Sequence, residues 1–307
     1  MNYQQAQDYI FGYTDYEKMP MPHDPAFYDL RRVDELLARL GNPHLRAKSV
    51  HITGTNGKGS VAAMVASALS VSGYTTGLYT SPHLHTIRER IQIEGRPIPE
   101  ERFALLVEEL STAVEEGRAD PYKDVSTFEL LTVLAFLHFQ RDGAGAQVLE
   151  AGLGGRLDAT NVIPRPEVCL ITSISLDHTA VLGDTVDKIA AEKAGIIKPG
   201  AVVVSAPQPA PAARVIAARC AAAGAELVRV GEQVPWRLLE RSPEGQVLEI
   251  RGLQSRYRVK LPLRGSFQGD NAAMAVAALE ALGTPREAIV EGLERVEWPG
   301  RLEVLSR

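Results

Sequence analysis

Residues 49–74 read SVHITGTNGKGSVAAMVASALSVSGY, in which a β-rich segment runs into a glycine loop and then into a helical segment. Glycines let backbone N–H groups turn inward around phosphate oxygens, and the N-terminus of the following helix adds the positive end of its dipole. Lys58 is placed to neutralise the β- and γ-phosphates of a nucleotide, and Ser60 to reach a magnesium ion. The stretch predicts an ATP site formed by Gly54, Thr55, Asn56, Gly57, Lys58, Gly59 and Ser60.

The loop departs from the usual P-loop pattern, which places serine or threonine directly after the lysine. Here Gly59 intervenes between Lys58 and Ser60, and the first glycine lies too close to the lysine. A glycine-rich turn with a solvated lysine is the alternative. The strand–loop–helix setting favours phosphate binding.

The rest of the chain alternates short runs rich in valine, isoleucine and threonine with segments of helical period, the pattern of a mainly parallel, P-loop-type α/β sheet flanked by helices. Uninterrupted apolar runs suit strands that are covered on both faces. The predicted strands are 49–53, 75–79, 146–151, 167–172, 201–205 and 226–230. The predicted helices follow Gly57 and span 99–116, 127–141, 184–194, 210–223, 270–282 and 285–296. Alternating stretches within 236–261 predict a small antiparallel sheet.

Composition favours small-molecule partners in a reducing compartment. The 307 residues are 45% hydrophobic and 23% charged, and the net charge of -5 provides no general attraction to nucleic acid or anionic membranes. The two cysteines lack metal-ligand spacing. Neither a signal peptide nor the ~20-residue apolar run of a membrane span is visible. We therefore expect a cytoplasmic protein, acting as a monomer.

Several motifs extend the argument beyond the loop. TGTNGKGS at 53–60, followed by YTSPHL at 79–84, resembles the Mur-ligase superfamily and, within it, the folylpolyglutamate synthase and dihydrofolate synthase family. The resemblance runs from about Leu36 to Arg301. The further matches are ARLGNP (38–43), HLHTIRERIQIEG (83–95), STFELLT (126–132), LEAGLGGRLDATN (149–161), SISLDHTAVLGDT (173–185), AAEKAGIIKPG (190–200) and WPGRLE (298–303).

Glu150 ends a predicted strand, where a doubly wound sheet presents its ligand-binding residues. Its carboxylate and the Ser60 hydroxyl are the hard oxygen ligands that magnesium prefers. The resemblance implies two magnesium ions, the first held by Ser60 and Glu150, the second by Glu150, His178 and Ser81. The alternatives are a solvent-facing carboxylate for Glu150 and a capping or otherwise satisfied histidine for His178. Without the resemblance, Ser81 is better explained as the start of a turn before Pro82.

Lys193 lies on a predicted helix, where composition alone indicates a solvated surface lysine. The resemblance implies that it is carbamylated, so that it supports the magnesium site. Because carbamylation needs a neutral amine, we expect a lysine pKa depressed by the metals and by Lys58. Lys58, Lys193 and His178 form the expected catalytic set.

The resemblance also places Asn271 and Arg301 against the nucleotide. Asn271 begins a predicted helix, and a cap is its alternative role. Many relatives carry histidine before the glutamine of this motif, whereas this chain reads Ser266-Phe267-Gln268. The resemblance therefore does not imply the details of the adenine contact.

The positions that the resemblance implies for the acceptor are Leu40, Gly41, Phe128, Asp158 and Ala159. A flat heteroaromatic ring needs an apolar face to stack on and a carboxylate to accept its N–H donors. Phe128 and Asp158 supply both, although Phe128 alone would equally suit the core. Residues 80–90 form a polar loop that is long enough to close over acceptor and nucleotide.

These features imply an ADP-forming ligase in which ATP converts a carboxylate into an acyl phosphate, which the amine of L-glutamate attacks. The expected partners are ATP, two magnesium ions, glutamate, and dihydropteroate or a folate. A cell-wall Mur ligase shares the loop, but the LGNP and TSPHL motifs oppose it. A nucleotide-binding fragment without catalysis is the other alternative, because we expect residues 1–307 to form only the ATP-binding domain, with a C-terminal glutamate-binding domain absent.

Overall fold

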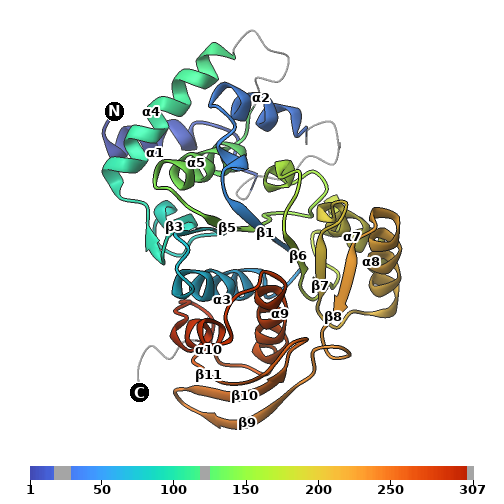
Figure 1. The fold of residues 1–307 in the computed structure, drawn as a ribbon. Helices are drawn as coiled ribbons and strands as arrows, with labels where there is room; N and C mark the ends of the chain where they lie inside the picture. Colours follow the sequence, from blue (N-terminus) through green and yellow to red (C-terminus); the bar gives the residue numbers. More distant parts are fainter. Residues whose placement is uncertain (17–28, 118–124, 303–307) are drawn as a thin grey trace.

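The computed structural model describes residues 1–16, 29–117 and 125–302 around an eight-stranded, mainly parallel sheet (Figure 1). The strand order is β4-β3-β2-β5-β1-β6-β7-β8, and only the pairings of β3 are antiparallel. This confirms the predicted α/β class. The strands are β1 (Lys48–Thr53), β2 (Thr76–Tyr79), β3 (Ile91–Ile93), β4 (Arg96–Pro97), β5 (Ala146–Glu150), β6 (Val168–Ile171), β7 (Val202–Ser205) and β8 (Glu226–Arg229).

Helices cover both faces of this sheet and divide its core into three apolar clusters. One face carries α3 (Lys58–Val71) and α9 (Gln268–Ala281), and α10 (Arg286–Arg295) packs behind them against α3. The opposite face is covered over one half by α1 (Tyr3–Phe11), α2 (Arg31–Arg39), α4 (Glu100–Glu116) and α5 (Thr127–Arg141). The other half is covered by α7 (Val186–Lys193) and α8 (Ala210–Ala223), with the short α6 (Thr179–Leu182) before them.

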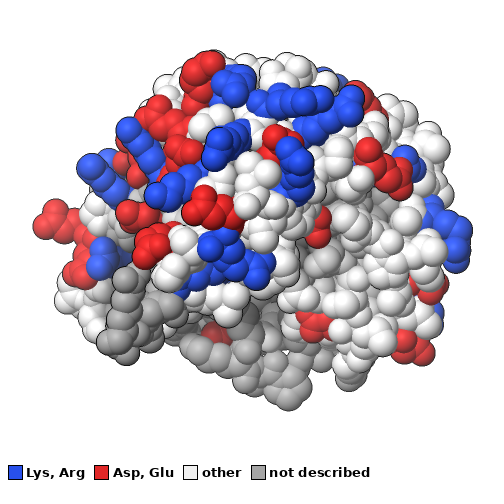
Figure 2. Space-filling view, turned by 90° about the horizontal axis from the view of Figure 1, so that it is seen from below, with Lys and Arg blue, Asp and Glu red and all other residues white. Residues whose placement is uncertain are grey.

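A separate three-stranded antiparallel sheet lies beyond α9 and α10 (Figure 1). It consists of β9 (Trp236–Ser242), β10 (Gly245–Arg251) and β11 (Arg256–Leu261), and its inner residues join the cluster beneath α3. Seen from this side of the molecule, acidic and basic side chains lie interspersed (Figure 2), and Arg237 pairs with Glu249 across two strands at 2.8 Å. The sequence predicted this sheet as a hairpin and did not separate β9, whose register slips at a bulge opposite Val247 and Leu248.

Other short elements also escaped the sequence pattern. Helices α1 and α2 and the edge strands β3 and β4 were not predicted. The two strands contain three and two residues, too few to show a period. Helix α1 buries only Ala6 and Ile10. The boundaries of the predicted strands and helices otherwise differ by no more than two residues, the usual uncertainty of such limits.

Candidate active site

The site lies at the carboxyl ends of the parallel strands, around β1. The chain leaves β1 for β2 on one side of it and later reaches β6 on the other, so a crevice opens where the strand order reverses. The loops after β1, β2, β5 and β6 meet there: residues 54–57, 80–86, 151–158 and 172–178.

The glycine loop is fixed by its neighbours as well as by its own residues. Gly54 has φ +146°, and a Cβ atom there would lie 1.8 Å from the Thr172 hydroxyl oxygen, so only glycine fits. The Thr55 N–H donates to Ser173 O at 2.8 Å, and the Lys193 ammonium donates to Gly54 O at 2.7 Å. The loop is therefore held between the strand β6 exit and the end of α7.

Lys58 and Glu150 face each other where α3 begins and β5 ends. Their Nζ and Oε1 atoms are 4.0 Å apart, and the Ser81 N–H donates to Glu150 Oε2 at 3.3 Å. Burial raises the pKa of the Glu150 carboxyl to about 7, against the opposing effect of the Lys58 charge. A buried carboxylate with one distant cation partner is a place where a further cation would be stabilised.

Lys193 is buried, whereas composition alone indicated a solvated lysine on the surface of a helix. Burial first, and then the Lys58 charge, lower the pKa of the Lys193 ammonium to about 8. The sequence-based expectation of a depressed pKa therefore agrees with the structure, where burial is the principal cause. The neutral amine that carbamylation requires becomes accessible near this pH.

The first turn of α9 closes the other side of the glycine loop. Gln268 Nε2 donates to the Ser60 hydroxyl at 3.4 Å, and Asn271 Nδ2 donates to Gln268 Oε1 at 2.9 Å. A Cβ atom on Gly57 would lie 2.5 Å from Asn271 Oδ1, so the asparagine packs directly on the loop. Sequence analysis did not assign Gln268, which only the folded arrangement brings to Ser60.

The expected magnesium ligands are only partly assembled by protein groups. The described residues contain no cluster of three histidine, cysteine, aspartate or glutamate side chains that could hold a metal. Ser60, Ser81 and Glu150 nonetheless offer hard oxygen atoms, among them the buried Glu150 carboxylate, and this chemistry fits magnesium bound jointly with phosphate oxygens. His178 has φ +47° and a half-exposed side chain beside Asp177, and it lines the adjoining cavity.

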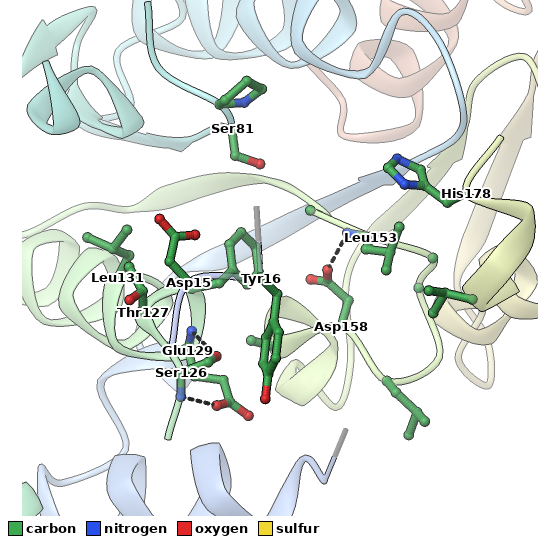
Figure 3. A pocket seen from close by; sticks show the side chains of 18 of the residues that line it. Asp15, Tyr16, Ser81, Ser126, Thr127, Glu129, Leu131, Leu153, Asp158 and His178 are labelled. Carbon is green, nitrogen blue, oxygen red and sulfur yellow. Dashed lines mark hydrogen bonds between the residues drawn. The ribbon is translucent and has the colours of Figure 1, made fainter. Parts of the chain in front are cut away.

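A cavity of about 890 Å³ extends from the glycine loop across the crevice. Figure 3 shows Ser81 above the cavity, His178 and Asp158 on one side of it, and Asp15, Tyr16 and Glu129 on the other. Lys58 and Thr55 also line the cavity. One continuous space therefore connects the predicted phosphate loop with the predicted acceptor residues.

Three of the five expected acceptor residues line this cavity: Phe128, Asp158 and Ala159. The Phe128 ring lies 5.9 Å from the Tyr79 ring, and a Cβ atom on Gly152 would come within 2.6 Å of it. The Asp158 carboxylate accepts the N–H groups of Leu153 at 2.9 Å and Thr160 at 3.0 Å. Leu40 and Gly41, at the end of α2, are not part of the cavity wall.

The far end of the cavity was not found by sequence analysis. It contains Asp15, Tyr16, Arg32 and Glu129, of which Arg32 and Glu129 form an ion pair at 3.2 Å. Glu129 also accepts the Ser126 N–H at 2.6 Å as part of the capping box of α5. The serine-to-glutamate spacing was a visible helix signal, but nothing in the sequence relates it to residues 15–32.

The loop at residues 80–90 is held by hydrogen bonds among its own residues. Glu89 accepts the N–H groups of Leu84, His85 and Thr86 at 2.8–3.1 Å, and the buried Arg90 donates to His83 Nδ1 at 2.9 Å. Among the histidines and arginines of this loop, His83 and Arg90 line the cavity, whereas His85 and Arg88 do not.

Comparisons with known proteins find relatives of this chain among folate ligases. The Mur ligase middle domain matches residues 52–279. A dihydrofolate synthase/folylpolyglutamate synthase of Bacillus subtilis is 36% identical over 99% of this chain and 70% of its own length. An FPGS–AMPPCP–folate complex superposes with a TM-score of 0.90 at 36% identity, over 100% of this chain and 74% of that one. Folylpolyglutamate synthase of Mycobacterium tuberculosis, complexed with ADP and AMPPCP, gives a TM-score of 0.82 at 38% identity, over 90% and 64% of the two chains.

Proposed function

The chain belongs to the folylpolyglutamate synthase and dihydrofolate synthase family of Mur-type ligases, and we propose from this that it joins L-glutamate to dihydropteroate or to the γ-carboxylate of a folate, using MgATP. The observation that carries the proposal is the single cavity shared by Lys58, Phe128 and Asp158. A phosphate-binding lysine and a wall suited to a flat ring thus face the same space.

The protein groups divide the work along this cavity. Lys58 and the N–H groups at the start of α3 neutralise the transferring phosphoryl group, while Phe128 and Asp158 hold the acceptor ring. Magnesium, held by Ser60, Glu150, Ser81 and His178 at two sites, supplies charge neutralisation at the phosphates when bound. The acceptor carboxylate attacks the γ-phosphorus and releases ADP, and the glutamate amine then displaces phosphate from the acyl phosphate.

Lys193 is the group best suited to carry the proposed carbamate. Its Nζ atom donates to Gly54 O, and its positive charge is repelled by the positive charge of Lys58. Conversion of the amine to a carbamate would replace a like-charge repulsion by an attraction.

The comparisons do not favour the cell-wall alternative. The relatives named as folate enzymes match the full length of this chain, and their own chains are longer.

The prediction that residues 1–307 are the ATP-binding domain, with glutamate bound by a second domain, stays a prediction, as do the cytoplasmic location and the monomeric state.

The nucleotide half of the proposal is tested with Lys58→Ala. Loss of a desolvated charge contact should weaken MgATP binding by about 2 kcal/mol in calorimetry. Lys188→Ala is the matched control, because Lys188 is an exposed lysine of α7 paired with Asp184. Equal MgATP affinities in the two variants would remove Lys58 from the site.

The acceptor half is tested by fluorescence titration with dihydropteroate, a reduced folate and a UDP-linked muropeptide. We expect the two pteridine compounds to bind and Asp158→Asn to weaken them, whereas the muropeptide does not bind. Preference for the muropeptide would transfer the chain to the cell-wall class. Incorporation of labelled glutamate by the protein from its native gene then identifies which pteridine is the substrate.

A further inference from the structure

A buried chain of hydrogen bonds connects the middle of β1 to the acceptor cavity. His51 Nε2 and the Thr160 hydroxyl oxygen are 2.8 Å apart, and the Thr160 hydroxyl donates to Asp158 Oδ1. His51 and Thr160 are fully buried, and the Asp158 side chain lines the cavity. Figure 3 shows the Asp158 carboxylate beside Leu153, whose N–H it accepts.

The direction of these bonds fixes the tautomer of the histidine. A threonine hydroxyl has one proton, and Thr160 gives it to Asp158. His51 Nε2 must therefore be the donor to the Thr160 oxygen, which leaves Nδ1 without a proton. In agreement, Nδ1 is buried and has no hydrogen-bond partner in the described structure.

Burying a histidine at this position costs desolvation free energy unless its ring is hydrogen-bonded. Val50 and Ile52 point to the cluster beneath α3, so the alternation of β1 turns Ser49, His51 and Thr53 to the opposite face. An apolar side chain would satisfy this buried position without desolvating an imidazole. His51 and Thr53 instead bind the segment after β5, because His51 contacts Thr160 and Thr53 donates to Gly154 O.

We propose that His51 is a positioning residue for the acceptor: by donating Nε2–H to Thr160, it fixes the plane in which the Asp158 carboxylate faces the cavity. This inference rests on the proposed function, in which Asp158 accepts N–H donors of the acceptor ring. His51 touches neither substrate. It lies on the acceptor side of β1, so its loss should affect acceptor binding and spare the nucleotide.

The test compares variants that keep or remove the donor. His51→Gln retains an N–H near the Nε2 position, His51→Met has similar length without a donor, and Thr160→Val removes the hydroxyl at constant shape. We expect Thr160→Val, which removes a hydrogen bond to a charged group, to weaken dihydropteroate or folate binding about tenfold, and His51→Met, which removes a hydrogen bond between neutral groups, to weaken it about threefold to tenfold. His51→Gln should retain the affinity, and MgATP affinity should stay within about twofold in all three.

Three results would overturn the inference. Equal weakening of acceptor and MgATP binding would indicate a general structural role, and equal losses in His51→Gln and His51→Met would indicate packing rather than donation. A ¹⁵N spectrum showing His51 protonated at Nδ1 would refute the tautomer. If His51→Met does not fold, Thr160→Val and the spectrum still decide.

Two controls separate this inference from the proposed function. Asp158→Asn measures the acceptor site itself. If it leaves acceptor affinity unchanged, the proposed acceptor site is wrong, and the inference falls with it. If it weakens binding while Thr160→Val does not, the acceptor site stands and only the inference is refuted. His138→Met removes another buried histidine, at the far end of α5, and should leave acceptor affinity unchanged.

Discussion

At the scale of single residues, Gly59 shows how closely the nucleotide loop is enclosed. It lies in the first turn of α3, where alanine would favour the helix by about 1 kcal/mol. A Cβ atom at this position would lie 2.9 Å from Trp298 Cζ2 and 3.2 Å from Glu150 Oε2. The glycine therefore marks a contact between the loop, the end of β5 and the segment after α10.

This contact predicts that Gly59→Ala destabilises the protein in spite of its better helix propensity. Overpacking costs about 1–3 kcal/mol, and the clash is with a rigid ring. We expect the loss to shrink in a Trp298→Phe background, with a coupling of about 1 kcal/mol in a double-mutant cycle followed by urea denaturation. Additive effects of the two substitutions would contradict the contact. Calorimetry of the four proteins with MgATP should show the same coupling.

At the scale of elements, α5 links helix capping to the acceptor wall. Ser126 caps the helix, Glu129 completes the capping box and pairs with Arg32, and Phe128 sits between them facing the cavity. The order of the first turn thus determines where the ring wall lies. Burial raises the pKa of Glu129, and the Arg32 charge opposes this most strongly.

Ser126→Ala should lower the free energy of unfolding by about 1 kcal/mol, the usual effect of losing a serine cap. Because Phe128 lies in the same turn, acceptor affinity should also fall, whereas MgATP affinity should not. Ser111→Ala is the control, since Ser111 lies inside α4 and its hydroxyl donates only to Glu108 O. A control variant that loses as much stability as Ser126→Ala would contradict the capping argument.

At the scale of the whole molecule, the core of the sheet contains buried, uncharged polar side chains beside its apolar clusters. His51 and His44 are both buried, and burial lowers their pKa to about 3 and about 4. Described helices include none long and apolar enough to cross a membrane. The apolar clusters on the two faces of the sheet therefore enclose titratable groups, whose protonation is coupled to the free energy of unfolding.

The buried histidines make global stability depend on pH. Below about 6.5 the unfolded chain binds protons on these residues, while the folded chain stays unprotonated until their lowered pKa values are reached. The histidine contribution to the free energy of unfolding should therefore fall between pH 7 and 5, by about 2 kcal/mol for a fully buried histidine, while the raised pKa of the Glu150 carboxyl acts in the opposite direction. Urea denaturation at both pH values should show a smaller fall in His51→Gln. Equal falls in the variant and the wild type would contradict a neutral buried His51.

The sequence alone determined the class of fold and most elements of the sheet, and it pointed to the candidate nucleotide loop. Helices 127–141 and 210–223 were predicted with the limits that the structure shows, because apolar period and capping are local properties of the chain. The loop at residues 54–60 and the strand-end Glu150 could likewise be identified, because a glycine loop and the end of a strand are recognised from a few neighbouring residues. The missed strands β3 and β4 were too short for any period to appear, whereas α2 carries Val33, Leu36 and Leu37 at helical spacing and could have been recognised.

Tertiary structure alone decided how these segments meet. The bond between Gln268 and Ser60 spans 208 positions, and the one between His51 and Thr160 spans 109, distances over which no pattern in the sequence pairs residues. Leu40 and Gly41 were expected at the acceptor, yet the end of α2 lies outside the cavity wall, which Arg32 and Glu129 join instead. The raised pKa of Glu150 and the lowered pKa of Lys193 have the same origin: desolvation depends on what the fold packs around a charge, which residue order does not state.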